Sequence, residues 1–235
     1  MNKKLSIIVP VYNEVKTVLI ILNKLKKLTL SNNFFSEIII VDDKSTDGTV
    51  ELLKKFKSKN PKVKLILKKE NKGKGHSQKI AKKYVTGKYI IVQDADLEYD
   101  PNDINKLLKI AINQNKDFVI GYRNLKTSIA HPYFYFRELA VNLLTLLMNI
   151  LYRTKIKDCA CCYRLFNSKM WMNINGKANQ FEYDFSIICK TILKTKNIGQ
   201  CSVYYNARTY KDGKKCTWDV GIHAFKRIIL DRFNI

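Results

Sequence analysis

Short apolar runs alternate with stretches of helical periodicity through the first half of the chain. The apolar runs have the length of strands and cover residues 5–9, 38–41, 63–67, 89–92 and 118–120. They are apolar at consecutive positions, which is typical of strands that are buried on both faces. The order of runs and helical stretches therefore predicts an α/β fold with a Rossmann-like, mostly parallel sheet flanked by helices.

Local signals mark the helix boundaries. A periodic stretch over residues 14–28 predicts the first helix, and Asp47 is a candidate N-cap for a helix that ends near Phe56. Pro101 is expected to open a helix that reaches about Asn113, because proline is favoured in the first turn.

Polar residues follow each predicted strand. In open parallel sheets, ligands bind beyond the carboxyl ends of the strands. The segments at those ends are residues 10–14, 42–43, 71–73, 94–96 and 121–123. We expect them to line one rim of the sheet and to form a binding site there.

The pattern changes after Arg123. An aromatic stretch (HPYFYFREL) and a mostly apolar segment, residues 139–152, precede a mixed region over residues 158–205. No internal repeat or flexible linker separates this part from the first half. The sequence therefore predicts one domain over residues 1–235, in which residues 124–235 form a mixed C-terminal elaboration.

Acidic residues gather after the fourth predicted strand, at Asp94, Asp96, Glu98 and Asp100. In an extended segment Asp94 and Asp96 point to the same side, and two close carboxylates repel each other unless a cation lies between them. Oxygen ligands suit Mg²⁺ or Mn²⁺, which proteins usually bind through one or two carboxylates and the phosphates of a substrate. Basic residues and glycines on the same rim indicate a diphosphate site, and a solvated acidic turn is the simpler alternative.

The chain carries 43 Lys and Arg residues against 20 Asp and Glu residues, a net charge of +23. Nucleic acid, an anionic membrane surface and phosphate-bearing substrates would each match this charge, and a genome-wide bias toward lysine would also explain it. The basic residues do not cluster with base-stacking aromatics in a recognised module, so a non-enzymatic nucleic-acid-binding protein is a remote alternative. Cys159, Cys161 and Cys162 are too close together for the usual paired zinc-site spacing, and the six cysteines are interpreted as reduced, mostly buried thiols of a cytoplasmic protein.

Motifs in a fixed order extend over nearly the whole chain. In the first half they are SIIVPVYNE (6–14), IIIVDDKSTDGT (38–49), ENKGKG (70–75) and QDADLEYDP (93–101). In the second half they are Arg137 with NLLTLLMN, KDCACCYRLF (157–166), QFEYDF (180–185) and NARTYKDGKKCTW (206–218). This ordered set resembles the family 2 glycosyltransferases with the GT-A fold, in the branch of dolichol-phosphate mannose synthases and polyprenyl-phosphate glycosyltransferases. The segment PVYNE stands where a sugar nucleotidyltransferase would have a glycine-rich loop, which argues against that class.

The resemblance implies a nucleotide-sugar-binding half, residues 1–123, and an acceptor-side half, residues 124–235. Nucleotide-sugar binding is expected at Pro10, Tyr12, Glu14, Asp43, Lys72, Gly73, Asp94, Ala95 and Asp96. The expected ligands of Mg²⁺ or Mn²⁺ are Asp94, Asp96 and Glu98. The expected contacts to an acceptor phosphate are Arg123, Arg137, Arg208 and Lys214. The expected catalytic residues are Asp96, Arg123, Arg208, Glu182 and Asp184.

The resemblance also implies transfer of a sugar from a nucleoside-diphosphate sugar, with inversion at the anomeric carbon. A polyprenyl phosphate is the expected acceptor, and it is already anionic at neutral pH, so cations can position it without a general base. The alternative acceptor is a sugar hydroxyl of a polysaccharide or glycan, for which Glu182 or Asp184 would take the proton. A helix N-terminus enriched in acids is the structural alternative for these two residues.

The apolar segment after the aromatic stretch is too short and too polar to cross a bilayer, but it could lie along one. Leu139, Leu143, Leu146, Leu147 and Ile150 share one helical face, which suits either a core helix or an interfacial helix. We therefore expect a cytoplasmic protein bound peripherally to the anionic cytoplasmic face of a membrane. A separate membrane subunit is a further candidate partner.

Overall fold

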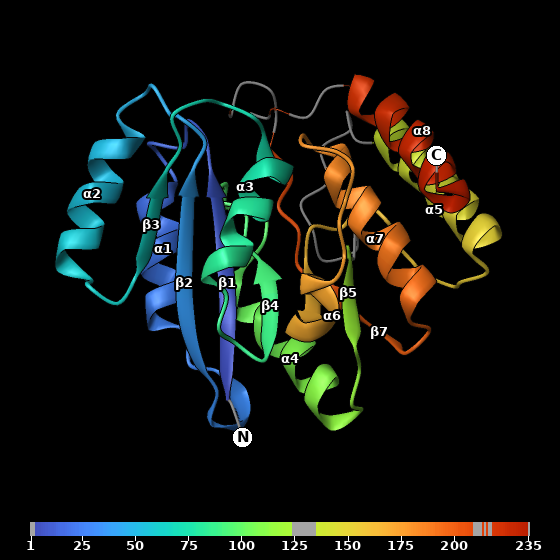
Figure 1. Ribbon diagram of the computed structural model, residues 1–235, viewed down its shortest axis with the longest axis horizontal. Coiled ribbons are helices and arrows are strands. Elements are labelled where there is room, and N and C mark those ends of the chain that lie inside the picture. Colours follow the sequence, from blue (N-terminus) through green and yellow to red (C-terminus); the bar gives the residue numbers. More distant parts are fainter. Residues whose placement is uncertain (1–2, 124–134, 209–212, 214, 216–217, 235) are drawn as a thin grey trace.

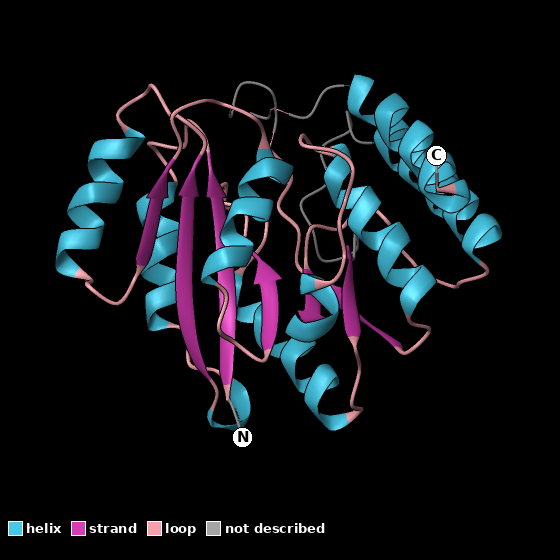
Figure 2. Cartoon of the chain, viewed as in Figure 1, coloured by secondary structure: helices cyan, strands magenta, loops and turns pink. Residues whose placement is uncertain are grey.

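The computed structural model describes residues 3–123, 135–208, 213, 215 and 218–234. Within them a seven-stranded sheet has the order β3-β2-β1-β4-β6-β5-β7 (Figures 1 and 2). The strands are β1 (Lys4–Val11), β2 (Phe35–Asp42), β3 (Lys64–Leu67), β4 (Tyr89–Val92), β5 (Phe118–Arg123), β6 (Arg164–Asn167) and β7 (Ile198–Val203). Strand β6 is antiparallel to its neighbours β4 and β5, and every other pairing is parallel.

The predicted α/β fold with a mostly parallel sheet is confirmed, and a strand forms at each of the five predicted positions. The side chains of β4 show why consecutive residues of the strands are apolar in the sequence. Tyr89 and Ile91 belong to the core on one face of the sheet, whereas Ile90 and Val92 belong to the core on the other. The pairing of β6 between β4 and β5 was not predicted, and it brings residues of the C-terminal half into the centre of the sheet.

Helices cover both faces of the sheet. They are α1 (Val18–Lys27), α2 (Thr49–Lys59), α3 (Lys74–Ala81), α4 (Ile104–Asn113), α5 (Tyr135–Tyr152), α6 (Ser168–Met172), α7 (Glu182–Lys194) and α8 (Trp218–Phe233), with short 3₁₀ helices at Ser31–Asn33, Lys82–Tyr84 and Pro101–Asp103. Helices α1, α2 and α4 pack on one face, and the others contribute to the core on the opposite face. Figure 1 shows α5 and α8 side by side at the end of the molecule opposite α2.

Two predicted helix starts are displaced along the chain. Helix α1 begins at Val18, because the chain first makes a turn in which the backbone N–H groups of Thr17 and Val18 donate to the carbonyl oxygen of Glu14. The N-cap of α2 is Gly48, with φ of 92°, one residue after the predicted Asp47. The Asp47 carboxylate still accepts the backbone N–H of Thr49 at 3.1 Å. The start predicted at Pro101 is confirmed, as a 3₁₀ turn that leads into α4.

Among the described cysteines, Cys159, Cys161, Cys162, Cys189 and Cys201 are free thiols. In the part of the chain that the structure covers, no helix combines the length and the apolar character that crossing a bilayer requires.

Candidate functional site

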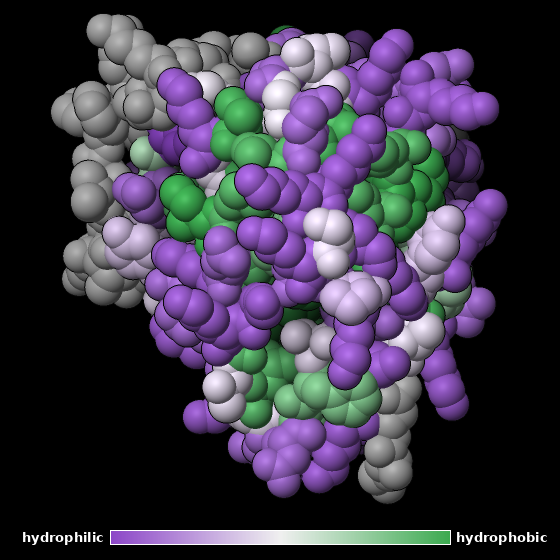
Figure 3. All heavy atoms as spheres, turned by 90° about the vertical axis from the view of Figure 1, so that its left-hand side faces the viewer, coloured by the Kyte–Doolittle hydropathy of each residue, from purple (hydrophilic) through white to green (hydrophobic). Residues whose placement is uncertain are grey.

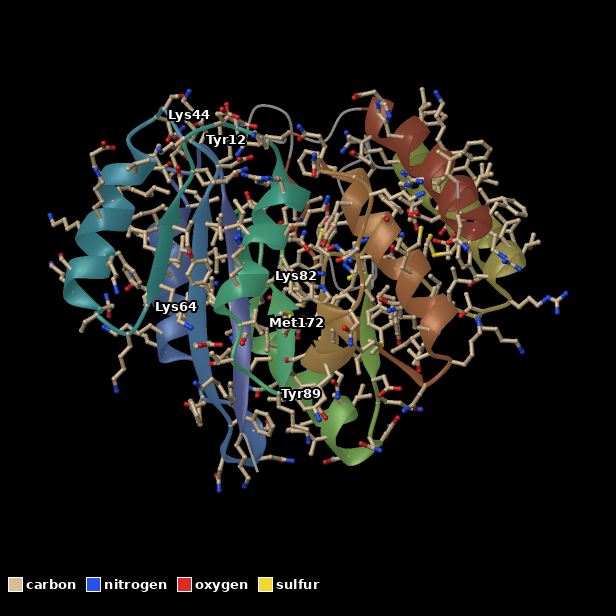
Figure 4. The ribbon with its side chains drawn as sticks, viewed as in Figure 1. Tyr12, Lys44, Lys64, Lys82, Tyr89 and Met172 are labelled. Atoms are coloured by element: carbon tan, nitrogen blue, oxygen red, sulfur yellow. The ribbon has the colours of Figure 1, made fainter. Side chains whose placement is uncertain are left out.

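A cavity of about 530 Å³ lies at the carboxyl ends of β1, β2, β4 and β5, where the topology predicts a binding rim. Figure 4 places Tyr12 and Lys44 at this edge, where β1 and β2 end. The expected site residues that line the cavity are Pro10, Tyr12, Glu14, Asp43, Gly73, Asp94, Ala95, Asp96, Glu98, Arg123, Arg137, Asp184 and Arg208. Lys72 and Glu182 do not line it, and Lys214 lies outside the described residues.

Asp43 joins the end of β2 to the loop that precedes α3. Its carboxylate accepts the backbone N–H groups of Lys72 at 3.0 Å and of Gly73 at 2.7 Å. The ammonium of Lys68 pairs with the same carboxylate, and both side chains are almost fully buried. The Lys72 side chain turns away to Glu70, 2.8 Å distant, so only the Lys72 backbone contributes to this part of the site.

Two glycines let α3 begin directly against the segment that precedes α7. Gly73 has φ of 92°, a conformation that favours glycine. A Cβ atom at Gly75 would lie 2.9 Å from the carbonyl oxygen of Asn179 and still closer to Tyr183. This close approach holds Lys74, between the two glycines, at the wall of the cavity.

The acidic run does not extend a strand as predicted. Strand β4 ends at Val92, and Asp96 lies in a turn in which its carboxylate accepts the backbone N–H of Glu98 at 3.1 Å. The predicted extended geometry of Asp94 and Asp96 is therefore wrong, although their charges lie close enough to interact.

Asp94, Asp96 and Glu98 each contact a residue from a distant part of the chain. The Lys74 ammonium lies 2.7 Å from Oδ1 of Asp94, and Nη2 of Arg208 lies 3.0 Å from Oδ2 of Asp96. Glu98 accepts the backbone N–H of Arg208 at 3.0 Å. The site thus balances its acids with cations from distant parts of the chain.

Asp96 is the acid whose environment disfavours its charge most clearly. Burial and the neighbouring charges of Asp94 and Glu98 raise the pKa of Asp96 to about 7, against the opposing effect of Arg208. A carboxylate in this setting gains more from a bound cation than an exposed one does.

The donor atoms fit a hard divalent cation. Among the described residues, no group of three or more His, Cys, Asp or Glu side chains is arranged to hold a metal ion. Mg²⁺ and Mn²⁺ do not require such a group, because one or two carboxylates suffice when substrate phosphates supply further oxygens. Asp94 and Asp96, with Glu98 next to them, provide oxygen donors of the suitable type on the cavity wall.

Glu14 connects the end of β1 to the segment after β7. Its carboxylate pairs with Arg208 at 3.2 Å and with Lys215 at 2.7 Å. The Lys215 ammonium also donates to the carbonyl oxygen of Tyr12 and lies 5.5 Å from the centre of the Tyr12 ring. Arg208 and Lys215 therefore reach across the part of the cavity where the nucleotide is expected.

Asp184 is enclosed by positive charge. Its carboxylate lies 3.0 Å from the Lys74 ammonium and 2.9 Å from Nη2 of Arg164, and it accepts a hydrogen bond from Gln78 at 2.8 Å. Burial alone would raise the pKa of Asp184, but the charges of Arg164 and Lys74 outweigh burial and hold this pKa below its usual range. Glu182 lies two residues earlier on α7 and has Lys79 as its charged neighbour, outside the cavity.

Two of the cations expected to contact the acceptor phosphate, Arg123 and Arg137, line the cavity. Arg123 makes two bonds to Asp158, at 2.7 and 2.9 Å, and its guanidinium lies 5.1 Å from the centre of the Tyr205 ring. Burial would lower the pKa of Arg123, but Asp158 raises it well above its usual value. Arg137 reaches the cavity from α5. Arg123 at the end of β5 and Arg137 on α5 thus contribute to the wall of one cavity.

Lys74, Arg164, Asp158 and Lys215 are site residues to which no individual role was assigned from the sequence. For Lys74, its position between two glycines was the available signal that it lies at the cavity wall. Arg164 and Asp158 are paired with residues far away in the chain, so their sequence neighbours gave no signal.

Comparison with known proteins assigns the chain to a family. The family model described as glycosyl transferase family 2 matches residues 6–174. The dolichol-phosphate mannosyltransferase of Pyrococcus furiosus is 33% identical over 136 residues, which are 58% of this chain and 38% of that protein. The dodecaprenyl-phosphate galacturonate synthase of Rhizobium johnstonii is 22% identical over 236 residues, which are 99% of this chain and 66% of that protein.

Solved structures show the same fold. Glucosyl-3-phosphoglycerate synthase of Mycobacterium tuberculosis, in complex with Mn²⁺ and UDP-glucose, matches 99% of this chain and 79% of its own, with a TM-score of 0.71 and 16% identity. This likeness confirms the GT-A-like architecture. The extent of the family match, together with the sheet and the motifs that line its rim, shows that the chain belongs to glycosyl transferase family 2 and is a nucleotide-sugar-dependent glycosyltransferase.

Proposed function

We propose that the protein transfers a sugar from a nucleoside-diphosphate sugar to a polyprenyl phosphate, with inversion at the anomeric carbon and with Mg²⁺ or Mn²⁺ as cofactor. Two relatives are named for dolichol phosphate and dodecaprenyl phosphate. The structural neighbour was crystallised with Mn²⁺ and UDP-glucose. These names support the proposed donor, cofactor and acceptor.

The state of Asp184 is the observation that carries the choice of acceptor. A sugar hydroxyl must lose a proton to a general base, and a base with a depressed pKa that already accepts three donors is poorly suited to that task. Glu182, the other candidate, does not reach the cavity. A phosphate acceptor needs neither of them, because it arrives as an anion.

In the proposed displacement, an oxygen of the acceptor phosphate attacks the anomeric carbon of the donor. The bond from that carbon to the diphosphate breaks, and the nucleoside diphosphate leaves with the electron pair. Lys74 and Arg208, which lie against the acidic run, stabilise the charge that develops on the leaving group. Arg123 and Arg137 position the acceptor phosphate, and Lys214 remains a candidate for the same role.

The divalent cation would be held by Asp94 and Asp96, with Glu98 beside them. When bound there, it would act as a Lewis acid on the diphosphate. Pro10, Tyr12, Glu14 and Asp43 stay our candidates for contacts to the base and ribose, because they line the same cavity.

We also propose that α5 lies along the membrane that contains the acceptor. Leu139, Leu143, Leu146 and Ile150 are all more than half exposed, and Phe136 is 70% exposed. Leu147, the fifth residue of the predicted face, is partly buried against the core. Helix α8 adds exposed apolar side chains at Ile222, Phe225 and Phe233 next to this surface.

The position of α5 connects that apolar surface to the site. Other residues of the same helix, from Arg137 to Leu144, line the cavity, so a phosphate at the membrane surface would have a short path to it. Basic residues such as Lys226 on α8 would favour anionic lipid. The opposite end of the molecule, shown in Figure 3, is covered mostly by hydrophilic side chains.

The test is a screen of nucleoside-diphosphate sugars with Mn²⁺ or Mg²⁺, with release of nucleoside diphosphate as the readout. We expect release that depends on added polyprenyl phosphate. Release that requires a sugar hydroxyl instead, and that is lost in Glu138→Gln, would favour the glycan alternative, because Glu138 is a further carboxylate on the cavity wall.

A further inference from the structure

Arg208 contacts one oxygen of Asp96, an expected ligand of the divalent cation. Nη2 of its guanidinium lies 3.0 Å from Oδ2 of Asp96, and Nη1 lies 3.2 Å from Oε2 of Glu14. The Arg208 side chain is only 14% exposed, so this contact is sheltered from solvent. One residue from the C-terminal part of the chain thus neutralises acids that follow β1 and β4.

Electrostatics makes these two cations competitors. Arginine keeps its charge at every pH that a protein tolerates, so the guanidinium cannot yield by losing its proton. A metal ion on the Asp96 carboxylate would lie within a few ångströms of the Arg208 guanidinium. Two positive charges repel each other strongly at that distance in a partly buried site. The contact between Arg208 and Asp96 therefore weakens metal binding, and a bound metal ion weakens that contact.

The site is built so that Arg208 can release Asp96 without a large loss. Nη2 also contacts Oε1 of Glu14 at 3.3 Å, so the guanidinium retains an acidic partner. Lys215 lies 2.7 Å from Glu14 and keeps that carboxylate paired if Arg208 moves further. The buried Nε of Arg208 finds no acceptor among the described residues, so the side chain still has a donor to offer an incoming anion.

We propose that Arg208 is an internal counter-ion of Asp96 until metal and donor bind. Its guanidinium then moves from Asp96 to the donor diphosphate. This inference rests on the proposed function, because it takes Asp96 as a metal ligand. It gives Arg208 two successive partners. It also implies that the protein without nucleotide binds a divalent cation weakly, because the cation must first displace Arg208.

Binding of Mn²⁺ alone to the 235-residue chain tests this exchange, with the electron paramagnetic resonance signal of free Mn²⁺ as the readout. We expect Arg208→Ala and Arg208→Gln to bind Mn²⁺ roughly ten-fold more tightly than wild type, because they remove one charge-assisted contact to a carboxylate. Arg208→Lys keeps the positive charge and should stay near the wild-type affinity. Circular dichroism verifies that each variant is folded, and the glutamine variant preserves most of the side-chain volume.

Lys215→Ala is the matched control, because it removes a cation from Glu14 and leaves the contact to Asp96 in place. It should leave Mn²⁺ affinity close to wild type. If wild type binds Mn²⁺ and the neutral Arg208 variants bind it no more tightly, the exchange is refuted while the proposed function stands. If no variant binds Mn²⁺ with or without nucleoside diphosphate, the metal-dependent function itself fails, and the exchange fails with it.

Discussion

At the scale of single residues, the site is organised by pairs of opposite charge between distant segments. Lys74 lies between Asp94 and Asp184, 2.7 and 3.0 Å from their oxygens, and its side chain is 12% exposed. Asp184 on α7 therefore helps to hold the Lys74 ammonium against Asp94.

Replacing Asp184 tests this arrangement. Asp184→Asn keeps the shape of the side chain but leaves Lys74 and Arg164 without one buried counter-charge, so we expect a loss of about 3 kcal/mol in the free energy of unfolding. Urea denaturation at neutral pH measures this loss. Glu182→Gln, on the same turn but outside the cavity, is the control and should change stability by less than about 0.5 kcal/mol.

The contribution of Asp184 to the free energy of unfolding should depend on pH. The pKa of Asp184 is lower in the folded protein than in the unfolded chain, so its contribution to stability is fully present above about pH 4 and is lost as pH falls toward the folded-state pKa. Stability measured between neutral and acidic pH should therefore fall less steeply in Asp184→Asn than in wild type. Parallel pH profiles for the two proteins would contradict this assignment.

Asp96 is the residue on which donor activation depends. Asp96→Ala removes an expected ligand of the divalent cation, which would stabilise the charge on the leaving diphosphate. We therefore expect the rate of transfer to fall at least about a hundred-fold, as it does when other groups that stabilise transition-state charge are removed. The far-ultraviolet circular dichroism spectrum should remain that of wild type. Turnover at the wild-type rate in a folded Asp96→Ala protein would exclude Asp96 from the mechanism.

At the scale of elements, the contact between α3 and the start of α7 positions Lys74. Gly75→Ala would place a Cβ atom 2.9 Å from the Asn179 carbonyl oxygen, so we expect α3 to shift and the protein to lose about 1–3 kcal/mol of stability. Gly221→Ala in α8 is the control, because a Cβ there meets nothing within 4 Å. It should be neutral or stabilise by up to about 1 kcal/mol. Thermal denaturation of both variants measures the difference.

Helix α5 carries the prediction on membrane binding. The double substitution Leu143→Glu and Leu146→Glu places charge on the exposed face of α5, so we expect binding to vesicles with anionic lipid to fall about ten-fold or more. Ile20→Glu, at a 48% exposed position on α1, is the matched control and should bind like wild type. Sedimentation with vesicles is the measurement. Equal binding of both variants would remove α5 from the membrane contact.

At the scale of the whole molecule, the sequence predicted what depends on local periodicity and on the topology of parallel strands. The segments that follow β1, β2 and β4 were expected on one rim, and they line one cavity. The role of the cavity residues and the single-domain organisation stay predictions. The family 2 resemblance was confirmed by a match over residues 6–174.

What escaped prediction depends on contacts between distant segments. The insertion of β6 between β4 and β5 follows from long-range pairing that no local pattern encodes. Glu182 and Asp184 looked equivalent in the sequence, yet residues two apart on a helix point in different directions, so only Asp184 enters the cavity. The cation on Asp96, Arg208, is 112 residues away in the chain, and one of the two cations on Asp184, Arg164, is 20 residues away.

The chemical structure of the product shows whether the sugar is transferred to a lipid phosphate or to a hydroxyl group. After incubation with a nucleoside-diphosphate sugar that supports turnover, Mn²⁺ and polyprenyl phosphate, phosphorus and proton nuclear magnetic resonance identify the atom that received the sugar. We expect a sugar joined to the lipid phosphate oxygen as a phosphodiester, with the anomeric configuration opposite to that of the donor. A lipid phosphate that remains an unmodified monoester while the sugar appears on a hydroxyl group would contradict it.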